Sequence, residues 1–271
     1  MNRINTCFEK LNSDGNKGLI AFVTAGDPSL GATSDIMHAL VAGGADIIEL
    51  GVPFSDPIAD GEVIQRASER ALSHGTSLND VLDCVDVFRQ KDPDTPVILM
   101  GYCNPFQRMG LGTLAARCNE VGADGVLVVD LPPEEAAPFK NSFEPLGIAQ
   151  IFLVAPNSPE KRIRKICEYA SGFVYFVAVK GVTGDKQFDG NEIKDNIDRT
   201  KSIAGIPVGL GFGIRNSQAA RDAAAIADGV VVGSAIVEII EKSETVSEIV
   251  ENVTHFVREL RTGINRSVKI N

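Results

Sequence analysis

Eight short apolar runs, each followed by a segment with helical spacing, constrain the fold of this chain more than any other feature. The runs are Leu19–Ala25, Asp46–Leu50, Pro96–Gly101, Gly125–Val129, Ala149–Ala155, Phe173–Val179, Pro207–Leu210 and Gly229–Val232. Between them, apolar residues recur every three or four positions, as at Ile36, Leu40 and Val41. Alternation of strand and helix is typical of a parallel sheet. Eight such units in 271 residues predict a closed (β/α)8 barrel.

Helical patterns beyond one per strand occur at three places in the chain. Met1–Asn12 has apolar residues at helical spacing and predicts an extra N-terminal helix that packs on the body. The longest interval, between the second and third runs, holds two helical patterns, Gly61–Ser73 and Leu78–Arg89. A short helix, Ala235–Ile240, follows the eighth run. We therefore expect extra helices in the loops after strands 2 and 8.

No linker or low-complexity stretch divides the chain, so residues 1–271 are expected to form a single α/β TIM-barrel domain. A doubly wound open sheet is the structural alternative. Such a sheet normally binds its ligand beside one glycine-rich turn, whereas glycines here follow several late runs.

Composition and charge exclude several classes of protein. The content of 44% hydrophobic and 23% charged residues is average for a globular chain, so no metal or disulfide is needed to hold the core. The net charge of −10 argues against nucleic acid and anionic membranes as partners. Five cysteines without a paired motif indicate free thiols in a reducing compartment, so we expect a cytoplasmic protein. No 18-residue apolar run or signal-peptide core is present.

The stretch from Glu49 to Gly61 is where chemistry is expected. Two carboxylates, Glu49 and Asp60, bracket an apolar loop rich in proline and glycine. Side chains alternate along a strand, so if Ile48 and Leu50 face the helices, Glu49 faces inward at the strand's carboxyl end. Barrel interiors are normally filled by Val, Ile or Leu, and active sites lie at this end of the strands. A carboxylate there predicts acid/base chemistry rather than packing.

The same alternation directs further side chains into the barrel. Near the mouth they predict a flat apolar pocket suited to an aromatic ring. These residues are Phe22, Met100, Tyr102, Leu127, Leu153 and Tyr175.

Three late loops predict a phosphate site. Glycines follow the sixth, seventh and eighth runs at Gly181–Gly184, Gly211–Gly213 and Gly233–Ser234, and the last pair opens the short helix. Glycines let backbone N–H groups approach an anion, and a helix N-terminus adds positive potential. Loops after strands 7 and 8 are the usual phosphate site of this fold. The ligand is therefore expected to be a phosphate ester with an apolar end.

Six motifs resemble, over essentially the whole chain, the family of tryptophan synthase α subunits. They are Glu49-Leu-Gly-Val-Pro-Phe-Ser-Asp-Pro-Ile-Ala-Asp-Gly61, Tyr102-Cys-Asn-Pro105, Asp130-Leu-Pro132, Gly181-Val-Thr-Gly184, Gly211-Phe-Gly-Ile214 and Gly233-Ser-Ala235. The first is highly specific, and the others occur in the right order.

The resemblance implies retro-aldol cleavage of indole-3-glycerol phosphate to indole and glyceraldehyde 3-phosphate, without a metal or cofactor in this chain. It assigns Glu49 both proton transfers and Asp60 a hydrogen bond from the indole N–H. The ring pocket would comprise Phe22, Ile64, Met100, Tyr102, Leu127, Tyr175, Thr183 and Phe212. The phosphate would be bound by Gly184, Gly213, Gly233 and Ser234.

The resemblance also implies a partner, the β subunit, which carries pyridoxal phosphate and would complete an α2β2 heterotetramer. Two apolar loops beside the mouth suggest the contact surface. Its expected residues are Pro53, Asp56, Pro57, Asn104, Pro105 and Phe106. The segment Gly181–Asn191 is expected to be a mobile lid that closes over the site with ligand and partner.

One departure from the family pattern leaves an alternative open. Many members have Ser-Arg before the sixth loop, where this chain has Ala178 and Val179, followed by Lys180. Lys180 is the basis of the rival hypothesis, a Schiff-base aldolase acting on another sugar phosphate. A carboxylate magnesium site at Asp56, Asp60 and Asp130 is a weaker alternative, since loop aspartates are more often caps or turn formers. A catalytically silent barrel that regulates a partner is the third.

Overall fold

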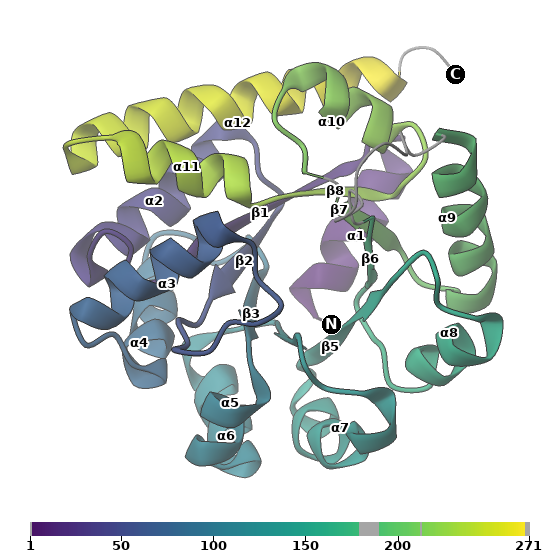
Figure 1. Ribbon diagram of the computed structural model, residues 1–271, viewed down its shortest axis with the longest axis horizontal. Coiled ribbons are helices and arrows are strands. Elements are labelled where there is room, and N and C mark those ends of the chain that lie inside the picture. The colour runs from purple at the N-terminus through teal and green to yellow at the C-terminus, as the bar shows by residue number, and fades with distance from the viewer. Residues whose placement is uncertain (1, 179–189, 212, 269–271) are drawn as a thin grey trace.

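Eight parallel strands close into a barrel in sequential order, as the computed structural model shows for residues 2–178, 190–211 and 213–268 (Figure 1). The strands are β1 Gly18–Thr24, β2 Ile47–Gly51, β3 Val97–Gly101, β4 Gly125–Val128, β5 Ala149–Val154, β6 Val174–Val177, β7 Val208–Gly211 and β8 Gly229–Val232. Every apolar run predicted as a strand overlaps one of these strands, and β1 pairs with β8 to close the ring. The predicted (β/α)8 barrel is confirmed, and the open sheet is excluded.

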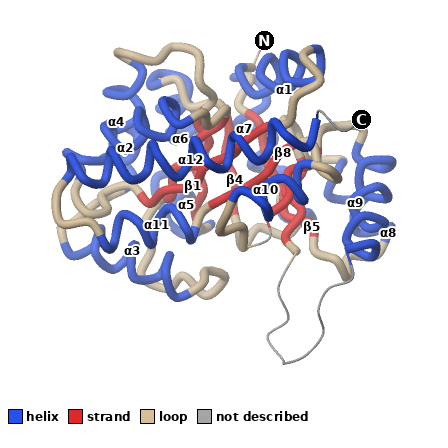
Figure 2. Tube along the Cα trace, turned by 90° about the horizontal axis from the view of Figure 1, so that it is seen from above, coloured by secondary structure: helices blue, strands red, loops and turns tan. Residues whose placement is uncertain are grey.

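Helices surround the strands on all sides (Figures 1 and 2). They are α1 Arg3–Ser13, α2 Leu30–Gly43, α3 Glu62–Ser73, α4 Leu78–Arg89, α5 Cys103–Met109, α6 Leu111–Val121, α7 Ala137–Phe143, α8 Glu160–Cys167, α9 Gly190–Ala204, α10 Ser217–Ala224, α11 Ser234–Lys242 and α12 Val246–Val268. The extra helices predicted at the N-terminus and after strands 2 and 8 are confirmed as α1, α3 with α4, and α11. Among the described helices, none is both long enough and apolar enough to cross a membrane.

The core consists of an outer layer between strands and helices and an inner layer within the barrel. Ile48 and Leu50 belong to the outer layer, while Ile47 packs in the interior, so the predicted alternation along β2 is confirmed. Because both faces of every strand are covered, the strands are apolar on both sides rather than on alternate positions.

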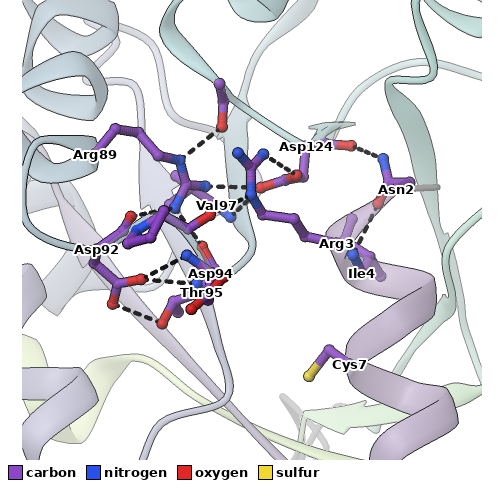
Figure 3. A network of polar contacts seen from close by, with 12 residues as sticks. Asn2, Arg3, Ile4, Cys7, Arg89, Asp92, Asp94, Thr95, Val97 and Asp124 are labelled. Atoms are coloured by element: carbon purple, nitrogen blue, oxygen red, sulfur yellow. Dashed lines mark hydrogen bonds and ion pairs between the residues drawn. The ribbon is translucent and has the colours of Figure 1, made fainter.

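The N-terminal end of the barrel is closed by α1. Ile4 and Phe8 of this helix pack with the barrel interior, and in Figure 1 the helix is seen through the ring of strands. Asp124, just before β4, fixes it there: its carboxylate accepts hydrogen bonds from Arg3, from Arg89 and from the backbone N–H of Val97 (Figure 3). Closure of this end leaves the opposite, C-terminal end of the strands as the entrance to the barrel.

One predicted loop is a helix. The segment after β3, expected to be an exposed interface loop, forms α5, and the carboxylate of Asp130 accepts the backbone N–H of Cys103 at its start. Pro105 is tolerated there because the first N–H groups of a helix have no partner within it. The turn buries Phe106 completely, against Gly101 and Val52. The prediction that Phe106 lies on a partner surface is therefore wrong.

Candidate active site

A cavity of about 220 Å³ opens at the C-terminal end of the barrel, and Glu49 lies in its wall. Apolar side chains of Phe22, Ile64 and Met100 line it beside the carboxyl group. Tyr175 of β6 lines the same cavity. The inward direction predicted for the strand residues Phe22, Met100 and Tyr175 is therefore confirmed. The arrangement places one acid inside an apolar pocket.

Glu49 is 1% exposed, and neither of its carboxyl oxygens has a hydrogen-bond partner among the described residues. Burial raises its pKa to about 8, because no opposite charge or hydrogen bond offsets the cost of removing a carboxylate from water. Glu49 is therefore mostly protonated at neutral pH, the state that a general acid needs. A buried carboxyl group without partners is costly in the free protein, which indicates that a ligand supplies the missing contacts.

Tyr175 and Gly211 fix the shape of the pocket wall next to Glu49. Burial, and to a smaller degree the nearby Glu49 carboxyl, raise the pKa of Tyr175 well above its ordinary value, so its hydroxyl stays protonated. Gly211 of β7 pairs with Val177 of β6, two residues after Tyr175, and a Cβ at Gly211 would lie 2.7 Å from the Tyr175 ring carbon Cε1. Only glycine leaves room for the tyrosine ring at this position.

Asp60 is held by Tyr102. The Tyr102 hydroxyl donates to Asp60 Oδ2 at 3.1 Å and accepts the backbone N–H of Ala59 at 3.0 Å. Phe54 stacks on the Tyr102 ring with centroids 5.1 Å apart. Burial raises the pKa of Asp60, and the Tyr102 hydrogen bond only partly offsets this. The aspartate is thus oriented, with a second oxygen left for another donor.

The two acids face neighbouring cavities. A smaller cavity, lined by Asp60, Tyr102 and Thr24, shares Phe22, Ile64 and Met100 with the cavity of Glu49. These three shared side chains are the walls on which a flat ring lying between the acids would pack.

The glycine loops that follow β7 and β8 also line the larger cavity. Gly213, with a positive φ of 52°, lies on it together with Gly233 and Ser234. Ser234 is the first residue of α11, so unpaired N–H groups at the start of this helix lie beside the cavity. This is the geometry of an anion site.

One predicted ring-pocket residue lines neither cavity, and other predicted residues lie outside the described part of the chain. Leu127 is fully buried in the barrel interior, in register with Met100, and lines neither cavity. Thr183, Gly184, Phe212 and Lys180 lie outside the described residues, as does the predicted lid up to position 189.

Thr24 and Arg215 are among the lining residues that were not predicted from the sequence. Thr24 lines the smaller cavity, and its inward position follows from Phe22 two residues earlier in the same strand. Arg215 lines the larger cavity, but nothing in the sequence distinguishes it from an ordinary surface arginine.

The expected interface residues differ in how exposed they are to solvent. Asp56 and Asn104 are exposed, Pro57 and Pro105 are half-buried, and Pro53 is buried. Between their two segments runs a groove of about 640 Å³. Ile58, which was not predicted, is 88% exposed and is the most exposed large apolar side chain among the described residues.

The magnesium alternative finds no support in the geometry. Asp130 caps α5, and Asp56 accepts a hydrogen bond from the neighbouring Ser55 hydroxyl. Within the part of the chain that the structure describes, no three His, Cys, Asp or Glu side chains are grouped so that they could hold a metal ion.

Comparison with known proteins gives one consistent family. A family model described as tryptophan synthase alpha chain matches residues 8–265. The tryptophan synthase alpha chain of Azoarcus sp. (strain BH72) is 51% identical over 265 residues, which cover 98% of this chain and 97% of the relative. That of Burkholderia pseudomallei (strain K96243) is 51% identical over 269 residues, covering 99% of both chains.

Solved structures lead to the same family. The crystal structure of tryptophan synthase subunit alpha from Legionella pneumophila str. Paris superposes with a TM-score of 0.91 at 39% identity, covering 98% of this chain and 99% of that one. A chain of the aminoacrylate-bound tryptophan synthase of M. tuberculosis gives a TM-score of 0.87 at 32% identity, with 97% and 100% covered.

Proposed function

This chain belongs to the tryptophan synthase alpha chain family, and on that premise we propose that Glu49 and Asp60 are its catalytic pair. The chain is a carbon–carbon lyase that catalyses the alpha reaction, the cleavage of indole-3-glycerol phosphate to indole and glyceraldehyde 3-phosphate in tryptophan biosynthesis. The observation that carries the assignment of residues is the buried carboxyl group of Glu49, which has no hydrogen-bond partner among the described residues and lies in an apolar cavity.

Glu49 begins the reaction as an acid. The bond to be broken joins carbon 3 of the indole ring to the first carbon of the glycerol chain, which bears a hydroxyl group. Proton transfer from Glu49 to carbon 3 converts the indole into an indolenine, which can accept the electron pair of that bond. Because the raised pKa keeps the proton on Glu49 near neutral pH, no other group has to supply it.

Asp60 stabilises the charge that this step creates. Protonation of carbon 3 places positive charge on the ring nitrogen, and its N–H becomes a stronger hydrogen-bond donor. One oxygen of Asp60 already accepts from Tyr102, so the carboxylate is fixed before substrate arrives. Charge that develops only during the reaction is stabilised best by groups oriented in advance.

Glu49 then acts as a base. After the first transfer its carboxylate lies in an apolar cavity where it is unstable, which favours removal of the proton from the adjacent hydroxyl. The carbonyl of glyceraldehyde 3-phosphate forms, the carbon–carbon bond breaks, and indole leaves with its aromatic ring restored. Glu49 ends the cycle protonated, so one residue serves both transfers.

Binding of the substrate uses the two ends of the cavity. Phe22, Ile64 and Met100 would hold the ring between the acids, and Tyr175 would close the pocket beside Glu49. The phosphate would bind to the N–H group of Gly213 in the loop after β7 and to those of Gly233 and Ser234 at the start of α11.

The family implies a complex with a beta subunit. We propose an α2β2 assembly in which pyridoxal phosphate belongs to the beta subunit and this chain uses no cofactor of its own. Asp56, Pro57, Asn104 and Pro105, beside the exposed Ile58, are the proposed contact residues. The five unpaired cysteines favour a reducing, cytoplasmic location.

The test is indole release from indole-3-glycerol phosphate by the wild type and by Glu49→Gln, each with and without the beta subunit. Positioned acid/base groups contribute about 10²–10⁴ in rate, and here one residue makes two transfers, so cleavage should fall at least that far. A Glu49→Gln variant with a tenth of the wild-type rate would remove Glu49 from this role. A wild type without activity would instead favour the silent regulatory barrel.

A further inference from the structure

Arg215 lies in the loop after β7, two residues beyond Gly213, and lines the same cavity as Glu49, Gly233 and Ser234. Its side chain is 58% exposed, and its Nη1 donates to Glu238 Oε2 at 2.8 Å. Glu238 belongs to α11, one turn after Ser234, so this ion pair joins the loop after β7 to the helix whose start forms part of the anion site.

Charge distinguishes Arg215 from the other lining residues. Among the described residues that line this cavity, it is the single cationic side chain, and Glu49 is the single acid. The chain as a whole carries a net charge of −10. A phosphate monoester adds about −1.5 to −2 charges near pH 7, so it enters a region where the protein's overall field opposes it.

Backbone N–H groups alone offset only part of this electrostatic repulsion of the phosphate. The start of α11 provides about half a positive charge, and the effect weakens where water has access. The Arg215 guanidinium at the edge of the cavity adds positive charge there, part of which its partner Glu238 offsets. It also has five N–H donors in a planar fork that fits phosphate oxygens, and Glu238 is the hydrogen-bond partner of one of them.

A purely structural role for the Arg215–Glu238 ion pair accounts less well for its position beside the anion site than phosphate binding does. Exposed ion pairs contribute little to stability. The pair does, however, restrict where the guanidinium lies, and Glu238 reaches back towards the start of α11 because helical side chains point towards the N-terminus. The carboxylate thus keeps the arginine beside the anion site in the free protein.

We infer that Arg215 is a substrate-binding residue that contacts the phosphate group of indole-3-glycerol phosphate, with Glu238 holding it beside the cavity. The inference rests on the proposed function, because it assumes that the phosphate lies at the start of α11. It adds a side-chain contact to a site otherwise built from backbone N–H groups.

The experiment compares Arg215→Gln and Arg215→Lys with Arg164→Gln, a matched control. Arg164 is 63% exposed and pairs with Glu160 within α8, so the control removes the same charge from a similar ion pair that does not line the cavity. Three quantities are measured: KM for indole-3-glycerol phosphate, the inhibition constant of inorganic phosphate, and the affinity for indole.

For Arg215→Gln we expect KM and the inhibition constant of phosphate to rise together by about tenfold or more, as for loss of a hydrogen bond to a charged group. Indole affinity should stay within about twofold, because indole carries no phosphate. Arg215→Lys should retain part of the affinity, and Arg164→Gln should match the wild type. Increased salt should weaken phosphate inhibition more in the wild type than in Arg215→Gln.

Unchanged phosphate inhibition in Arg215→Gln would overturn the inference. Equal losses of phosphate and indole affinity would also overturn it, because they would mean a general disturbance of the cavity. Failure of the proposed function looks different: cleavage would then persist in Glu49→Gln, whatever the phosphate affinity of the Arg215 variants.

Discussion

Replacing Glu49 by glutamine should stabilise the fold, and the gain should grow as the pH rises. The wild-type carboxyl group has an ordinary pKa of 4.5 in the unfolded chain and a pKa raised to about 8 by burial in the folded protein. Between these values the unfolded chain has released the proton while the folded protein still holds it. Folding then requires proton uptake, so stability falls with increasing pH.

The magnitude follows from the pKa difference. Each pH unit between 4.5 and about 8 costs the wild type up to about 1.4 kcal/mol of unfolding free energy. The accumulated penalty is about 3 kcal/mol at pH 7 and levels off near 5 kcal/mol above pH 8, as upper bounds. Glutamine does not ionise in this range, and its different hydrogen bonding adds only an offset that is independent of pH.

The assay is urea unfolding of both proteins at pH 5.5, 7.0 and 8.5, with the difference in unfolding free energy plotted against pH. All other titrating groups are common to both chains and cancel. Glu251→Gln, at an exposed position of α12, controls for the general effect of removing a negative charge. A flat difference for Glu49→Gln would refute the reasoning, since the carboxyl group would then ionise as easily in the folded protein as in the unfolded one.

Four further substitutions, at three positions, test Asp60, the wall of the larger cavity and one buried ion pair of the fold. Asp60→Asn should lower the cleavage rate about 10- to 100-fold, as for a hydrogen bond to a charged group, and Asp60→Ala should lower it further; equal wild-type rates in both would make the carboxylate structural. Gly211→Ala should raise KM and lower the free energy of unfolding in urea by about 1–3 kcal/mol, because the added methyl group displaces the Tyr175 ring. An unchanged KM would mean that the Tyr175 ring moves aside without changing the substrate pocket. Arg70→Met should destabilise the fold by about 3–5 kcal/mol in urea unfolding, because Asp27, which is 1% exposed, loses both of its hydrogen bonds from Arg70; a loss below about 1 kcal/mol would contradict this.

The barrel could be predicted from the sequence because its two signals are local. Each buried strand is a short apolar run, and each helix has a three- or four-residue apolar spacing, so neither depends on distant contacts. The inward direction of the Glu49 side chain could be predicted for the same reason. Side chains alternate along a strand, and its neighbours Ile48 and Leu50 both face the helices.

What could not be predicted depends on tertiary contacts. The sequence predicts an apolar interface loop after β3, but the Asp130 cap and the burial of Phe106 make residues 103–109 a helix. Neither contact is visible without knowing how β3 and β4 lie side by side. Arg215 is similar: only the fold brings the loop after β7 to the start of α11.

The protonation state of Glu49 is the claim on which the account most depends, and it can be measured directly. Carbon-13 NMR of protein labelled at the glutamate side-chain carboxyl carbons, titrated with pH, assigns the Glu49 signal by its absence from Glu49→Gln. If Glu49 starts the reaction as an acid, the midpoint lies near 8 in the free protein. A midpoint near 4.5 would show an ionised carboxylate at neutral pH, and Glu49 could not then be the acid that begins the reaction.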